Sequence, residues 1–175
     1  GAWALYTDEG SSHIILENNL CYRTNGHIFH QHYGRENTVR NNIFIQGAEA
    51  VTACSRIEPH VSVVFFRNIM VSAGTPIFAN DYGAGARRIL SDGNLFWDTT
   101  RAQPVLSRGG AGRPEADLAA WQARGFDLHS RLADPGFVDP AKDDFRLRPD
   151  SPALALGFET LGLHDVGPRP PEQRD

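Results

Sequence analysis

The sequence predicts an all-β protein, a right-handed parallel β-helix of about four coils with a C-terminal cap that contains one short helix. The first observation is a repeat of Asn followed by an aliphatic residue, at Asn19, Asn42, Asn68 and Asn94. Their spacings of 23, 26 and 26 residues are typical of solenoids. The second observation is that matching apolar residues follow each Asn: Leu20, Ile43, Ile69 and Leu95 after one place, then Cys21, Phe44, Met70 and Phe96 after two.

Each repeated Asn is expected at a sharp turn of the coil. Asn tolerates the left-handed backbone conformation, and its side-chain amide bonds readily to nearby backbone groups. In successive coils these amides would also bond to one another, as a ladder along the stack. The alternative is a β-rich sandwich in which four similar motifs recur by chance.

The chain divides into three parts. Residues 1–100 hold the coils, residues 101–167 form a C-terminal capping segment, and residues 168–175 form a tail rich in Pro and charge. Within the capping segment, residues 115–124 are expected to form a short helix that buries Leu118 and Trp121. Segments 137–139 and 144–147 are expected to be strands. Because a solenoid needs a cap over its last apolar coil, the helix and these strands are candidates for that cap.

Composition limits the classes of partner. The chain has 175 residues and a net charge of −4, so it lacks the basic footprint of a nucleic-acid-binding protein. No apolar run approaches about 18 residues, so no membrane-spanning helix is expected. Cys21 and Cys54 are expected to be free buried thiols. Because residues 3–7 already have the pattern of a strand, we expect N-terminal coils of a longer chain to precede them.

Aligning the coils on their Asn residues brings four polar segments side by side, at residues 6–10, 29–34, 53–56 and 78–83. Adjacent coils lie about 4.8 Å apart. The expected stack, coil by coil, is Asp8 or Glu9, Gln31 or His32, Ser55 or Arg56, and Asn80 or Asp81. This face is therefore expected to be dense in groups that transfer protons or bind sugars.

Three carboxylates near this face are candidate catalytic groups: Asp8, Glu9 and Glu36. Glu36 follows one coil after Asp8 and Glu9, a separation that suits the paired carboxylates of glycosidases. The expected substrate-binding residues are His30, His32, Tyr33, Arg56, Asp81 and Tyr82, with Tyr6 and Phe29 as further stacking surface. The alternative is that the acids cap turns or pair with Arg35, Arg40 or Arg87.

His30 and His32 lie two positions apart, which places them on one face of a strand. Together with Asp8 or Glu9 they could ligate a metal ion, but no ligand motif accompanies them. We therefore expect neither a metal nor a cofactor.

Residues 6–12 and 29–37 resemble the right-handed parallel β-helix proteins of the pectate-lyase-like superfamily, in particular bacterial β-helical glycoside hydrolases. Residues 134–140, 144–147 and 150–153 resemble the ending common in that group. The resemblance implies a secreted or periplasmic glycoside hydrolase with a polysaccharide or oligosaccharide substrate. Glu36 or Glu9 would be the acid, and Asp8 the nucleophile or base.

Two other functions remain open within this resemblance. In a polysaccharide lyase, Arg56 or His32 would be the base, and Arg35 would neutralise the uronate carboxylate. In a non-catalytic module, the same face would bind carbohydrate or have a structural role. A lyase product absorbs near the ultraviolet edge, which separates the two enzymes.

Overall fold

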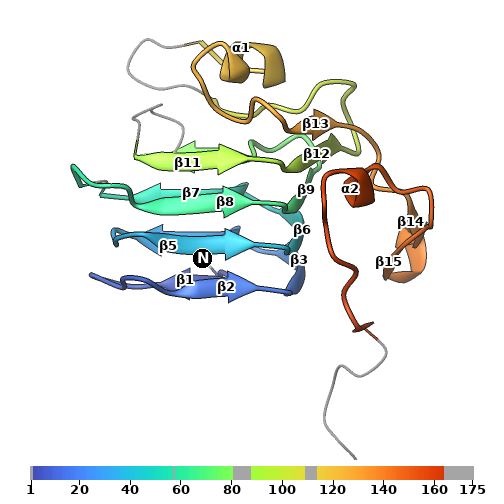
Figure 1. Cartoon of the computed structure of the whole chain (residues 1–175), viewed down its shortest axis with the longest axis horizontal. Coiled ribbons are helices and arrows are strands. Elements are labelled where there is room, and N and C mark those ends of the chain that lie inside the picture. Colours follow the sequence, from blue (N-terminus) through green and yellow to red (C-terminus); the bar gives the residue numbers. More distant parts are fainter. Residues whose placement is uncertain (1, 57, 81–87, 109–113, 164–175) are drawn as a thin grey trace, which may run out of the picture.

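The chain folds as an all-β parallel β-solenoid with only two short α-helices. A computed structural model describes residues 2–56, 58–80, 88–108 and 114–163. Strands from successive coils stack in register into three parallel sheets (Figure 1). The solenoid makes about three turns, slightly fewer than the four coils that we expected, because four stacked strands in a sheet enclose three intervals.

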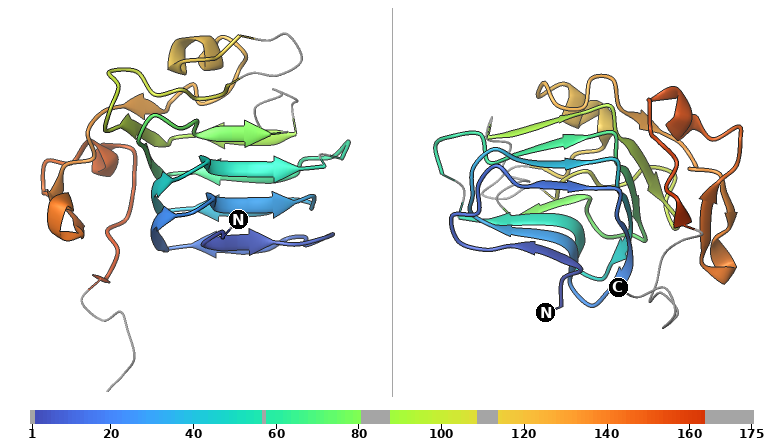
Figure 2. Two further views of the ribbon diagram at one scale, coloured as in Figure 1. Left: turned by 180° about the vertical axis from the view of Figure 1, so that it is seen from behind. Right: turned by 60° about the horizontal axis from the view of Figure 1, so that its bottom comes forward.

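The three sheets form the three sides of the coil. The first sheet contains β1 (Leu5–Thr7), β4 (His27–His32), β7 (Ala50–Ser55) and β10 (Phe78–Asn80). The second contains β2 (Ile15–Glu17), β5 (Asn37–Arg40), β8 (Val63–Phe66) and β11 (Ile89–Asp92). The third contains β3 (Leu20–Thr24), β6 (Ile43–Gly47), β9 (Ile69–Ser72), β12 (Leu95–Asp98) and β13 (Arg131–Leu132). Viewed from the N-terminal end, the chain turns clockwise as it recedes, so the coil is right-handed (Figure 2, right).

The predicted asparagine ladder is confirmed. The Nδ2 group of Asn19 donates to Asn42 Oδ1 at 2.9 Å, Asn42 donates to Asn68 Oδ1 at 3.0 Å, and Asn68 donates to Asn94 Oδ1 at 3.0 Å. Each of these oxygens also accepts the backbone N–H of the Asn one coil earlier. The last rung, Asn94, donates to the buried carboxylate of Asp127 at 3.0 Å. One column of amides therefore fixes the register of every coil.

We expected each ladder Asn to adopt the left-handed backbone conformation. The residue before it does so instead. Positive φ angles occur at Asn18 (59°), Asn41 (52°), Arg67 (53°) and Gly93 (65°). The physical reason is that the two neighbouring residues have separate roles. The first residue turns the chain, which leaves the next one with its amide directed along the stack toward the adjacent coils.

The expected apolar stacks also lie in register, but on opposite faces of the third sheet. Phe44, Met70 and Phe96 are fully buried inside the coil, and the half-buried Cys21 packs beside them. The other stack, Leu20, Ile43, Ile69 and Leu95, faces outward into a second hydrophobic cluster. Cys21 and Cys54 are both thiols rather than partners in a disulfide, Cys54 is fully buried, and burial raises the pKa of the Cys21 thiol to about 11.

Helix α1 (Leu118–Gln122) closes the C-terminal end of the coil (Figure 1). Trp121 is fully buried and stacks between Phe78 and Phe126, and its Nε1–H donates to Asp127 Oδ2 at 2.9 Å. Leu118 is half-buried against the same core. The helix therefore covers the last apolar coil, as a solenoid cap must.

The helix is shorter than the expected range of residues 115–124. Ala116 is held in a β-bridge with Ser107, its N–H donating to the Ser107 carbonyl at 2.8 Å. Asp117 then caps the helix by accepting the N–H of Ala120. An extended residue cannot also be helical, so the bridge sets where the helix begins.

The last described segment packs along the side of the coil and does not cap its end. It comprises β14 (Phe137–Asp139), a 3-10 turn (Pro140–Lys142), β15 (Asp144–Leu147) and α2 (Pro152–Ala155). Both strands were predicted within their observed bounds. Figures 1 and 2 show this segment alongside the third sheet. Its residues Phe137, Phe145, Ala153 and Phe158 belong to the same hydrophobic cluster as the outward apolar stack of that sheet. The expectation that these strands cap the last coil is wrong, because the outer face of the third sheet is itself apolar.

The ladder amide of Asn42 should make a measurable contribution to the free energy of unfolding. Asn42 is fully buried and bonds to both adjacent coils, so Asn42→Ala should lower the free energy of unfolding by about 1–3 kcal/mol in urea titration. Asn37 would be a poor control, because it is also fully buried and bonded to Ile14 and Ser11. The exposed Asn25 is the better control, and equal midpoints for the Asn42→Ala and Asn25→Ala variants would contradict a stabilising ladder.

Substitution of a buried residue in the cap should also lower the free energy of unfolding. Trp121→Ala removes a fully buried ring and should cost about 3–5 kcal/mol by chemical denaturation. Leu128→Ala is the control, because Leu128 lies on the same segment but is 59% exposed. A loss below about 1 kcal/mol for Trp121→Ala would show that α1 does not cap the core.

Candidate functional site

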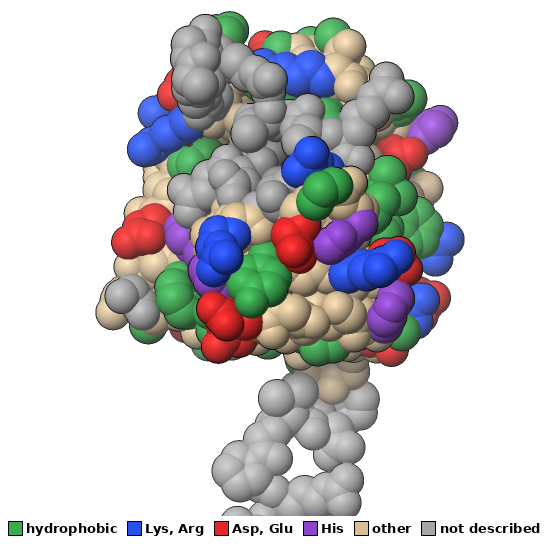
Figure 3. Space-filling view, turned by 90° about the vertical axis from the view of Figure 1, so that its left-hand side faces the viewer, with side chains coloured by type: hydrophobic (Ala, Val, Ile, Leu, Met, Phe, Trp, Pro, Cys, Tyr) green, Lys and Arg blue, Asp and Glu red, His purple; other side chains and the backbone are tan. Residues whose placement is uncertain are grey.

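The polar face that the sequence predicts is the outer surface of the first sheet. Tyr6, His30 and Ala53 pair in register and point outward, whereas Leu5 and Phe29 pair one place earlier and point into the core. Figure 3 shows the edge of the molecule where the loops from the first to the second sheet lie, with His, acidic and basic side chains distributed over it. Phe29 is fully buried, so the expectation that it offers stacking surface is wrong.

A chain of hydrogen bonds runs through three imidazoles and a serine hydroxyl on this face. His27 Nδ1 and His30 Nδ1 lie 2.9 Å apart, and His30 Nε2 lies 3.1 Å from Ser55 Oγ. Ser55 Oγ lies 2.7 Å from Nδ1 of His32. Aligning the coils on their repeated Asn residues placed His30, His32 and Ser55 in this neighbourhood. The parallel register of β4 and β7 brings them together.

A carboxylate stands at each end of this chain. Glu49 Oε2 lies 3.3 Å from His27 Nε2, and Glu9 Oε1 lies 3.6 Å from His32 Nε2. The expected neighbourhood of Glu9 and His32 is therefore present. Both carboxylates are mainly exposed, whereas His27 is buried. The arrangement connects two solvent-facing acids through buried and half-buried groups that can each pass a proton.

Aromatic rings form an exposed platform beside the imidazoles. Trp3 stacks on Tyr6 with ring centroids 4.7 Å apart and on His30 at 4.6 Å. Trp3 and Tyr6 remain 40% and 42% exposed. Flat, exposed aromatic faces next to polar groups are suited to stacking against the apolar face of a sugar ring.

The two neighbouring acids, Asp8 and Glu9, have different partners. The Tyr6 hydroxyl donates to Asp8 Oδ1 at 2.7 Å, which lowers the pKa of Asp8 and raises that of Tyr6 to about 12. Glu9 is bonded by the Tyr33 hydroxyl and lies beside His32. Asp8 is therefore held as a carboxylate, the form needed for a nucleophile or base.

The third candidate acid, Glu36, belongs to a separate group of charges at the start of the second sheet. Its carboxylate lies 3.6 Å from His13 Nδ1 and 3.3 Å from Arg35 Nε. Glu36 also has a positive φ of 52°, in the loop that precedes β5. The contacts with Arg35 and His13 match the ion-pairing alternative considered for the acids.

The remaining expected binding residues are placed in part. The Arg56 guanidinium lies over the Tyr33 ring, 5.0 Å from its centroid, and Tyr33 in turn contacts His32. Asp81 and Tyr82 lie outside the described residues.

Sequence reasoning missed three members of this site: Trp3, His27 and Glu49. His27 and His30 are three positions apart, so strand alternation places them on opposite faces. Ile28 and Phe29 between them both face the core, which leaves the two imidazoles side by side outside. The cluster His27, His30 and His32 was the available signal.

Burial keeps His30 uncharged. Desolvation first, and then the neighbouring His27 and His32, lower the His30 pKa to about 4. Desolvation also lowers the pKa of His27, against the opposing pull of Glu49. Neutral imidazoles can both donate and accept a hydrogen bond, as a relay through His30 requires.

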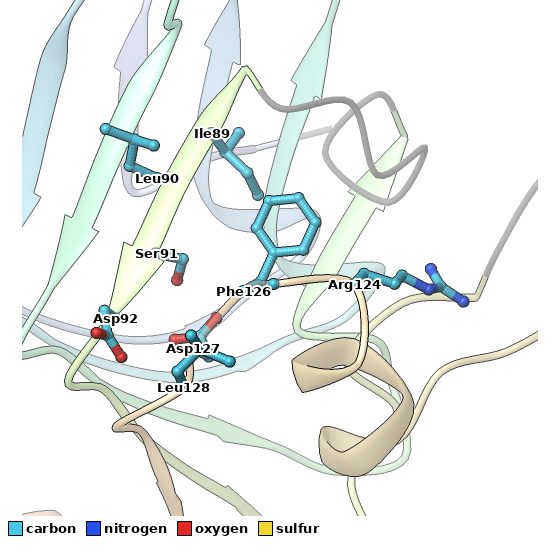
Figure 4. A pocket seen from close by; sticks show the side chains of 9 residues that line it. Ile89, Leu90, Ser91, Asp92, Arg124, Phe126, Asp127 and Leu128 are labelled. Atoms are coloured by element: carbon cyan, nitrogen blue, oxygen red, sulfur yellow. The ribbon is translucent and has the colours of Figure 1, made fainter.

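A cavity of about 430 Å³ lies elsewhere, between β11 and the segment that follows α1. Figure 4 shows Phe126 and Asp127 facing Ser91 and Ile89 there, while Arg124 extends away. Asp127 is almost fully buried and its pKa is raised by desolvation. Because it accepts from Trp121, Ser130 and Asn94, this carboxylate joins the cap to the ladder, which is a structural task.

Within the part of the chain that the structure describes, no three His, Cys, Asp or Glu side chains converge in a way that would hold a metal ion. Among the same residues, no helix has the length and apolar character needed to cross a membrane. Comparisons with protein-family models, with characterised proteins and with solved structures give no match.

Acid should weaken the fold through His30. The unfolded imidazole binds a proton near pH 6.5 but the folded one only near pH 4, so the contribution of His30 to stability is full above pH 6.5 and is lost as the pH falls toward 4. The urea midpoint should therefore fall more steeply over this window in the wild type than in His30→Gln. Parallel pH profiles for the two proteins would contradict a buried, neutral His30.

Proposed function

We propose that this chain is a carbohydrate-active β-solenoid protein related to the pectate-lyase-like superfamily, and that it hydrolyses glycosidic bonds on the outer face of its first sheet. The observation that carries the proposal is the exposed Trp3–Tyr6 stack beside Asp8 and the imidazoles. Aromatic platforms bind sugar faces, and nearby carboxylates and imidazoles bind hydroxyl groups. A shallow face next to stacked strands suits an extended chain of sugars rather than a small molecule.

The chemistry assigns different roles to the two neighbouring acids. Asp8, kept ionised by the Tyr6 hydroxyl, is the nucleophile or the base that activates water. Glu9, which lies beside Tyr33 and His32, is assigned as the acid that protonates the leaving oxygen. In this proposal Arg56, held over Tyr33, and His32, beside Glu9, bind sugar hydroxyls.

A test of the binding step uses a panel of oligosaccharides and isothermal titration calorimetry. Trp3→Ala removes the indole ring of the platform and should weaken binding about tenfold, which corresponds to about 1.4 kcal/mol of binding free energy. Tyr22→Ala is a matched control, because Tyr22 has almost the same exposure, 39%, but lies on the third sheet. Equal affinities in the two variants would remove the platform from the site.

A test of the catalytic step measures new reducing ends released from the oligosaccharide that binds. Asp8→Asn should abolish release while leaving binding and the urea midpoint close to those of the wild type, because Asp8 is exposed. Asp150→Asn, at an exposed position on the C-terminal segment, should leave release unchanged. Full activity of Asp8→Asn would contradict the hydrolase assignment, and an ultraviolet-absorbing product would replace it with a lyase. Binding without any cleavage would indicate a non-catalytic module.

A further inference from the structure

Ser55 is the one hydroxyl of the described hydrogen-bond chain, and it lies between two imidazoles. It ends β7, is half-buried, and pairs in register with His32 on β4. Its Oγ lies 2.7 Å from His32 Nδ1 and 3.1 Å from His30 Nε2. A serine hydroxyl in contact with an imidazole that has a carboxylate on its other nitrogen is the arrangement that activates serine nucleophiles.

Proton positions that satisfy every contact from His27 Nδ1 to Glu9 can be assigned along this chain. If His32 carries its proton on Nε2, that N–H points toward Glu9, and the free Nδ1 accepts the Ser55 hydroxyl proton. His30 then donates from Nε2 to Ser55 Oγ and accepts at Nδ1 from His27. One imidazole is thus available as a base, and the other holds the hydroxyl in position.

We propose that Ser55 is the nucleophile of a second activity, the hydrolysis of small carboxylic esters, with His32 as its general base and with Glu9 and His30 as positioning residues. If the carbohydrate function proposed above holds, the natural ester is an O-acyl group on a sugar hydroxyl of the bound chain.

The reaction balances with water as the only co-substrate. Ser55 Oγ attacks the ester carbonyl carbon while its proton passes to His32 Nδ1, and the carbonyl electron pair moves to oxygen. The pair returns as the bond to the alcohol oxygen breaks, and the alcohol leaves with the proton from His32. Water then attacks the acyl-Ser55 ester, giving its proton to His32, and the carboxylic acid departs as Ser55 recovers its proton.

The residue after Ser55 adds a cation and a strained turn. Arg56 has a φ of 63°, in the left-handed region that is costly for a side chain of this size. Its guanidinium is held over Tyr33, beside His32. In this position Arg56 is available to stabilise the negative charge that develops on the carbonyl oxygen.

The first experiment measures hydrolysis of p-nitrophenyl acetate by the purified chain. The wild type should release an initial burst of p-nitrophenolate followed by slower turnover, because an acyl-enzyme accumulates. Ser55→Ala should lose the burst and at least about 100-fold in rate, and His32→Asn should lose a similar factor. Ser12→Ala is the control: the exposed Ser12 hydroxyl donates to the Gly10 carbonyl, so the burst of this variant should equal that of the wild type.

A second measurement does not depend on the variants folding. The wild type is incubated with a fluorophosphonate, and peptide mass spectrometry locates the adduct, which should lie on Ser55. A merely structural hydroxyl would not be labelled. No burst, or an adduct on another residue, would overturn the proposal.

The carbohydrate proposal is tested separately from this one. Neither the ester assay nor the fluorophosphonate contains a sugar, so their failure leaves the oligosaccharide titrations as they stand. Loss of oligosaccharide binding in Trp3→Ala alongside a normal burst would restrict the ester activity to the serine site. Release of acetate from an O-acetylated oligosaccharide, abolished in Ser55→Ala, would join the two.

Discussion

The structure depends on one repeated interaction, the hydrogen bond from each ladder Asn to the same residue in the next coil. In each bond the acceptor oxygen also takes a backbone N–H, so the side chain and the main chain are fixed together. A slip of one residue in register would move the buried side chains of a strand to its opposite face, so the apolar core already opposes it. A buried amide that fits only its counterpart prevents that slip. The register that this column fixes also determines which residues lie side by side on the outward face of the first sheet.

Much of the fold could be predicted because each coil of a solenoid repeats the same sequence pattern. The spacing of Asn19, Asn42 and Asn68 and the apolar residues after them give the same pattern in each coil, so chance agreement is small. The extent of helix α1 could not be predicted, since the bridge between Ala116 and Ser107 is a tertiary contact without a local signal. The side packing of Phe137 and Phe145 was missed for a related reason. An outward apolar stack and an inward one look identical when both are continuous in sequence.

The site was predictable to the extent that register determines it. Aligning coils on the Asn residues correctly placed Glu9 near His32 and Ser55 opposite His32. It failed where a strand departs from strict alternation, as at His27, and where a side chain reaches across coils, as Trp3 does to His30. The contacts of Glu36 with Arg35 and His13 depend on side-chain directions, which register alone does not give.

The ladder is also vectorial. Every rung donates toward the C-terminal end and accepts from the N-terminal side, so the amide dipoles align head to tail, and the partly positive end of the column meets the Asp127 carboxylate. This alignment does for a column of side chains what peptide alignment does for a helix, where an anion at the positive end is stabilising. A further coil stacked before Asn19 would have to donate to the Asn19 carbonyl oxygen. The polarity of the ladder therefore favours the addition of coils in one sense along the stack.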